Sequence, residues 1–115
     1  MRASTKSPLP LNPDLAVAYQ QAYDALGEAY WDASDLPSKD LLHGTQAAIG
    51  DIIDALDEAD VASNTDAFIS LTPKMKAIND QLKEIEASIK QITKNIDTAA
   101  AVMAAASKVL SLLPL

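Results

Sequence analysis

Few side chains in this 115-residue sequence have the type and spacing that catalysis or metal binding requires. His43 is the only histidine, so no second imidazole can join it in a zinc site of conventional spacing. As a general base it would act beside Asp40, but a surface histidine near carboxylates is the simpler interpretation. The sequence has no cysteine, which excludes disulfides, thiolate nucleophiles and cysteine-bound metals.

The densest group of carboxylates lies between residues 51 and 60. A calcium-binding EF-hand loop places its ligands at alternate positions around a glycine, whereas these acids follow helical spacing. The group consists of Asp51, Asp54, Asp57, Glu58 and Asp60. We therefore expect a solvated helix face that holds no metal and no cofactor. Nucleophile elbows, phosphate loops and dinucleotide motifs do not occur, so we expect no enzymatic activity.

Composition narrows the classes of partner. The net charge of −7 would repel nucleic-acid phosphates and anionic lipids, and aromatic residues make up 4% of the chain, too few for a base-stacking surface. We expect no nucleic-acid partner. The N-terminus has no apolar run of the kind a signal peptide needs, so the cytoplasm is the default location and a non-classical export route stays open.

The elements that must position these side chains are helical. Apolar residues recur with helical periodicity and the chain has only three glycines, which predicts an all-α fold: an antiparallel bundle of three long helices. Residues 1–12 show no periodicity and are predicted to form a flexible arm. Residues 13–115 are predicted to form a single bundle domain.

The first helix is predicted over residues 13–33, since Asn12, Pro13 and Asp14 give three successive start signals. Its apolar stripe is predicted to comprise Leu15, Tyr19, Tyr23, Leu26 and Tyr30. The second helix is predicted to begin near Pro37 or Ser38 and to end near Ala62. Its apolar face is predicted to comprise Leu42, Ile49, Ile52, Ile53 and Leu56.

A third periodic segment covers residues 66–113, with apolar residues at spacings that alternate between three and four. The seam comprises Phe68, Leu71, Met75, Ile78, Leu82, Ile85, Ile89, Ile92, Ile96, Ala99, Met103, Ala106, Leu110 and Leu113. Unbroken, this helix would extend for about 70 Å, and its far half would need a second copy of the chain as partner. The alternative is a break near residues 95–98, which yields a fourth helix and a compact monomer.

Charge is distributed unevenly along the helices. Residues 13–66 hold twelve of the sixteen acids and one base, Lys39, while six lysines and four acids follow residue 66. An acidic pair of helices can therefore lie beside a mildly basic segment and present its outer face to a basic partner protein. The acids predicted to bind that partner are Asp24, Glu28, Asp51, Asp54 and Glu58.

Trp31 is the only tryptophan, and it lies about 100° from the apolar stripe of the first helix. It either covers the junction with the second helix or serves as an exposed anchor for a partner, because tryptophan is strongly enriched among binding hot spots. We predict a non-enzymatic, helical protein-interaction module of the immunity, adaptor or secretion-accessory type.

The apolar C-terminal segment favours an alternative function. Residues 98–115 contain a single charge, Lys108. Released from the bundle, this segment would associate with a membrane, although it is slightly shorter than a typical span and its lysine opposes a permanent anchor.

Overall fold

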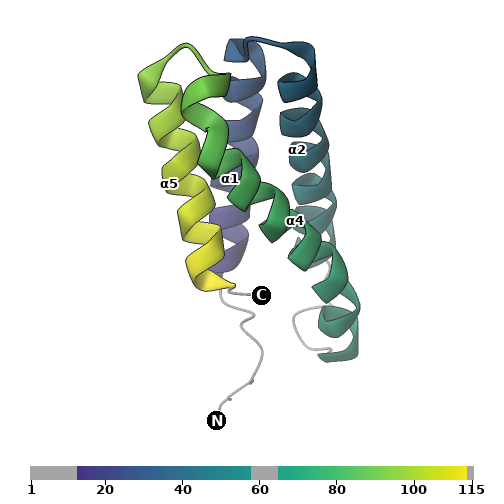
Figure 1. Ribbon diagram of the computed structural model, residues 1–115. Coiled ribbons are helices and arrows are strands. Elements are labelled where there is room, and N and C mark those ends of the chain that lie inside the picture. Colours follow the sequence, from purple (N-terminus) through teal and green to yellow (C-terminus); the bar gives the residue numbers. More distant parts are fainter. Residues whose placement is uncertain (1–12, 58–64, 114–115) are drawn as a thin grey trace.

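The computed structural model describes residues 13–57 and 65–113, which form a bundle of four helices running alternately up and down (Figure 1). These helices are α1 (Pro13–Asp32), α2 (Leu36–Asp57), α4 (Thr65–Ile92) and α5 (Ile96–Leu112). The predicted all-α bundle is confirmed, in its four-helix form. The predicted arm over residues 1–12 and the predicted helix end near Ala62 lie outside the described residues.

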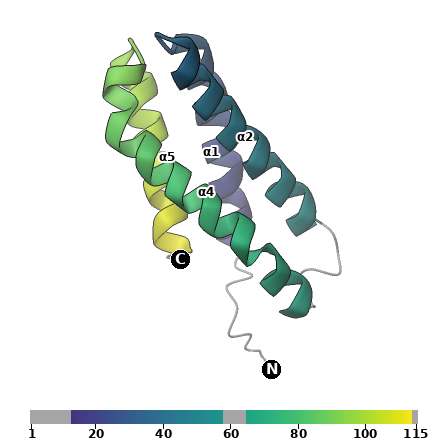
Figure 2. The ribbon, with the colours of Figure 1, turned by 45° about the vertical axis from the view of Figure 1, so that its right-hand side comes forward.

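The four helices form a ring in which α1 packs against α2 and α5, and α4 packs against the same two. Helices α1 and α4 therefore lie diagonally opposite each other. Figures 1 and 2 show that α4 is tilted, so that its N-terminal part extends beyond the end of α5 on the side of α2. Pro73 lies inside α4 without ending the helix.

A single core cluster fills the bundle, but its helices contribute side chains of different sizes. Helix α4 supplies large ones, including the fully buried Ile78, Leu82 and Ile85. Helix α5 supplies mainly alanine and valine, with Val102 and Val109 as its larger buried side chains apart from Leu113 just beyond its end. Small side chains allow two helices to approach closely, so α5 fits against α1 with little bulk between them.

A glycine of each helix lies at the contact between α1 and α2. A Cβ at Gly27 would come within 2.7 Å of the Gln46 amide nitrogen, which instead crosses this position to donate to the Tyr23 carbonyl at 3.1 Å. A Cβ at Gly50 would come within 3.2 Å of the Tyr23 ring. Each glycine thus makes room for a side chain of the opposite helix, and Tyr23 lies partly exposed beside Gly50 instead of in the core.

The helix break predicted near residues 95–98 is present, which excludes a single unbroken helix over residues 66–113. Asn95 caps α5 by accepting a hydrogen bond from the backbone N–H of Asp97 at 2.8 Å. The Asp32 carboxylate at the end of α1 accepts the backbone N–H groups of Lys94 at 3.0 Å and Asn95 at 2.7 Å. The connection after α1 and the connection before α5 are therefore joined at one end of the bundle.

The predicted seam is right along α4 and wrong at several positions of α5. As predicted, the buried apolar positions of α4 include Met75, Ile78, Leu82, Ile85, Ile89 and Ile92. Beyond the break the seam shifts by one position at several places: Val102 and Val109 are buried, while Met103 and Leu110 are only half-buried. Ile96, predicted to lie in the seam, is 78% exposed. A new cap starts a new helix whose rotation is set by its own contacts, so the heptad phase does not continue through it.

Candidate functional site

The first helix presents an outer ridge that carries three of the predicted partner-binding residues. Asp24, Glu28 and Trp31 follow one another at spacings of four and three, and all three are exposed. Val17 and Gln21 extend the same row toward the start of the helix and are exposed as well. We call these five residues the α1 ridge. Because residues at this spacing share one helix face, a partner can contact them together.

Trp31 forms the end of the α1 ridge and is 81% exposed. Its ring meets the Tyr30 ring edge-on, with centroids 5.2 Å apart, and the ammonium of Lys39 lies 6.0 Å from its centroid. Lys39 also donates to the Tyr30 carbonyl at 3.0 Å. Trp31 therefore lies at the junction of α1 and α2, as one prediction required, but it covers little of that junction and leaves most of its indole available to a partner.

A shallow groove of about 470 Å³ runs beside the α1 ridge, between α1 and α5. Its walls include Gln21, Asp24 and Glu28 from α1 and Lys108 from α5. Alanines from both helices make up the rest of the lining: Ala25, Ala101, Ala104 and Ala105. The groove therefore combines a smooth apolar surface with two carboxylates along one side.

The predicted acids of α2 lie apart from this groove. Asp51 and Asp54 are exposed on α2, and Asp54 borders a smaller groove of about 190 Å³ between α1 and α2. Gln20 borders the same groove and donates to the Asp24 carboxylate at 3.1 Å, which connects the two acidic surfaces. The fifth predicted acid, Glu58, lies outside the described residues.

His43 is exposed on α2 with its ring 5.8 Å from that of Tyr30, a tilted contact between centroids. Within residues 13–57 and 65–113, no three histidine or acidic side chains are arranged so that they can hold a metal ion. The ring contact of His43 is therefore with an aromatic side chain.

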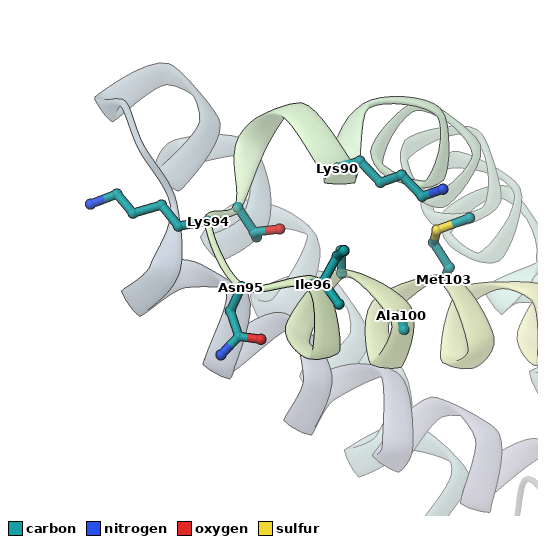
Figure 3. A pocket seen from close by; sticks show the side chains of 8 residues that line it. Lys90, Lys94, Asn95, Ile96, Ala100 and Met103 are labelled. Atoms are coloured by element: carbon teal, nitrogen blue, oxygen red, sulfur yellow. The ribbon is translucent and has the colours of Figure 1, made fainter.

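Another cavity, which the sequence did not predict, lies between the C-terminal end of α4 and the start of α5. It measures about 600 Å³ and is lined by Lys90, Thr93, Lys94, Asn95, Ile96, Ala99, Ala100 and Met103. We call it the α4–α5 groove. Figure 3 shows Lys90 extending over it toward Met103, whereas the ammonium of Lys94 points away. Ile96 and Ala100 face the same space, so the surface is apolar with a cation at its edge.

The signal that could have revealed this groove was Asn95. Asparagine is a strong N-cap, and a helix that starts there places Ile96 in the first turn, free of the heptad phase of α4. Following the alternating spacing through the cap instead assigned Ile96 to the core. Sequence periodicity was thus informative within each helix and misleading across the break.

The apolar face of α5 is packed in the bundle, where Ala99, Val102, Ala106 and Val109 are buried. None of the helices over the described ranges combines the length and the hydropathy needed to cross a membrane. The membrane association predicted as an alternative would require α5 to leave these contacts.

Comparisons with known proteins find no match for this chain. No protein-family model matches the chain, and searches of curated proteins and of solved structures find no significant match.

Proposed function

We propose that the protein is a non-enzymatic interaction module that binds a basic segment of another protein through the α1 ridge. The observation that carries this proposal is the exposure of Trp31 at 81% on the same helix face as Asp24 and Glu28. A large exposed aromatic ring leaves apolar surface in water, and burial against a partner recovers that free energy. Tryptophan at an interface commonly dominates the binding energy.

The carboxylates on this ridge define the charge of the partner. Asp24 and Glu28 lie one helical turn apart and line the same groove, where Lys108 is the only cation in the lining. A partner helix with lysines or arginines one turn apart would pair with both acids while its apolar side chains cover the alanine surface. The acids of α2 add to the negative potential that steers such a partner toward the ridge.

The test uses the single tryptophan as its reporter. The probe is a designed amphipathic helix with lysines one turn apart beside a leucine stripe, and a glutamate version of the same peptide is the control. Binding of the lysine peptide is expected to shift Trp31 emission to the blue and to weaken as salt is raised. Equal binding of the glutamate peptide would contradict the proposed charge preference.

Paired variants locate the surface. Asp24→Asn with Glu28→Gln is expected to weaken binding at least about fivefold, as for two partly desolvated charge pairs. The matched control, Asp80→Asn with Glu84→Gln, removes the same charge from exposed positions of α4 and is expected to change affinity less than about twofold. Replacing Asp51 and Asp54 of α2 by asparagine is expected to weaken binding by a factor between these two values. Equal losses from all three pairs would show that net charge, not the ridge, attracts the peptide.

A further inference from the structure

The α4–α5 groove differs in charge from the groove beside the α1 ridge and from the smaller groove between α1 and α2, both of which are lined by carboxylates. The charged residues in its lining are two lysines, Lys90 and Lys94, and no acid lines it. Ile96, Ala99, Ala100 and Met103 supply the apolar part of its surface. On a chain with a net charge of −7, a groove with this lining is a local reversal of sign.

The ammonium of Lys90 is available to a ligand. Glu86 lies one turn earlier on α4, but its carboxylate accepts a hydrogen bond from the Ser107 hydroxyl of α5. In the part of the chain that the structure describes, neither Lys90 nor Lys94 makes an ion pair. Because Lys90 extends over the groove toward Met103, its charge lies beside the apolar surface (Figure 3).

Ile96 contributes an exposed apolar side chain to this groove. It is 78% exposed, although the neighbouring Ala99 is buried in the core. The exposed isoleucine and the half-buried Met103 form a continuous apolar lining with Ala100. A ligand tail that covers this lining would remove apolar surface from water, which stabilises the complex in proportion to the area covered.

The volume of the α4–α5 groove suits a small molecule. Its lining on α5 runs from Ile96 to Met103, which spans only about 10 Å of helix axis at 1.5 Å per residue. A cavity of about 600 Å³ lies within the range of small-molecule sites.

We propose that the α4–α5 groove binds a single-chain anionic amphiphile, of the type of a long-chain carboxylate. The alkyl tail lies against Ile96, Ala100 and Met103, and the anionic head group pairs with the ammonium of Lys90. This site is separate from the α1 ridge, so each of the two proposals can fail without affecting the other.

The test titrates the full chain with sodium laurate below its micelle concentration. Binding is followed by calorimetry and by the methyl resonances of Met103 and Ile96, which are expected to shift before any others. Dodecyltrimethylammonium has an alkyl tail that is one carbon longer and the opposite charge, and it is expected to bind at least about fivefold more weakly. Equal affinity for the two amphiphiles would overturn the proposed role of the cation.

Two variants locate the site. Lys90→Gln is expected to weaken laurate binding about fivefold, while Lys83→Gln, an exposed lysine one heptad earlier on the same helix, is expected to leave it unchanged. Ala100→Phe places a ring in the groove from an exposed position and is expected to reduce binding at least about tenfold. Circular dichroism checks that each variant keeps its helices. Unchanged laurate affinity in both Lys90→Gln and Ala100→Phe would overturn the proposal.

Discussion

The two ends of the bundle are stabilised by different means. At the junction end, where residues 33–35 and 93–95 connect the helices, the contacts are polar: the Asp32 carboxylate accepts two backbone N–H groups, and Ser34 donates its N–H to the Ile92 carbonyl at 2.9 Å. Toward the opposite end, where α1 begins and α5 finishes (Figure 1), Tyr19 of α1 and Asn79 of α4 are fully buried.

The two ends also differ in whether their buried polar atoms have hydrogen-bond partners. The Tyr19 hydroxyl and the Asn79 side-chain oxygen are buried, and among the described residues neither has a hydrogen-bond partner. The Asn79 amide nitrogen does donate to the Leu113 carbonyl, at 2.6 Å, which holds the end of α5 against α4. A buried polar atom without a partner costs free energy, so packing at this end must compensate for two of them. The difference predicts which substitutions each end tolerates.

The largest effect is expected from removing packing at the opposite end. Ile78 lies beside Asn79 on α4 and is 1% exposed. Ile78→Ala would remove buried methyl and methylene groups and leave a cavity, so we expect the free energy of unfolding to fall by about 3 kcal/mol. Urea denaturation measures the change.

Lys76→Ala is the matched control, because Lys76 is exposed two residues earlier on the same helix. It is expected to change the free energy of unfolding by less than about 0.5 kcal/mol. A loss below about 1 kcal/mol in Ile78→Ala would contradict the view that this end depends on tight packing.

The fold was predictable because local signals and periodicity agreed. Pro13 and Asp14 started α1 at the predicted residue, and the apolar positions of α4 from Met75 to Ile92 are buried as the spacing required. What periodicity could not provide is the rotation of α5 after its cap, which depends on how its small side chains meet α1. The Asn95 cap shows that the heptad phase need not continue to Ile96, but the exposure of Ile96 depends on that tertiary contact.

The α1 ridge was predictable for a similar reason, since helical spacing alone places Asp24, Glu28 and Trp31 on one face. The exposed fraction of Trp31 was not, because it depends on how closely α2 returns beside the end of α1. Asn95 indicates the helix break beside the α4–α5 groove, but the lining of the groove depends on how the two helices meet there. Sequence therefore identified features within a helix and missed those formed between helices.

A smaller effect is expected at the junction end. Asp32→Ala leaves the backbone N–H groups of Lys94 and Asn95 without their carboxylate acceptor. Both hydrogen bonds lie at the surface, so water can take the place of the carboxylate. We expect the free energy of unfolding to fall by about 1–2 kcal/mol. Hydrogen exchange of these two amides is expected to accelerate by more than that of α4 core amides.

Asp32→Asn is the conservative counterpart, because its amide retains one oxygen that can accept from Asn95. It is expected to lose about half as much stability as Asp32→Ala. If Asp32→Ala lowers the free energy of unfolding more than Ile78→Ala does, the junction end contributes more to stability than the opposite end, and the proposed difference between the two ends is wrong.

The smallest effect at neutral pH, and the most specific, concerns the Tyr19 hydroxyl. Tyr19→Phe removes a buried oxygen that has no partner among the described residues and leaves the ring in place, so we expect stability to be unchanged or raised by up to about 1 kcal/mol at pH 7.

Burial raises the pKa of Tyr19 above its ordinary value of 10.0, which keeps the phenol neutral in the folded protein. In the unfolded chain the same phenol ionises above about pH 10. The folded state then holds the proton more tightly than the unfolded state, so stability that is fully present below pH 10 declines as the pH rises further. The wild-type protein is therefore expected to lose stability between pH 9 and 11 more steeply than Tyr19→Phe, as measured by urea denaturation at each pH. Stability–pH profiles that are parallel for the two proteins, or a clear loss of stability in Tyr19→Phe at pH 7, would contradict this prediction. Either result would show that the Tyr19 hydroxyl has a hydrogen-bond partner in solution, so that polar contacts also stabilise the opposite end.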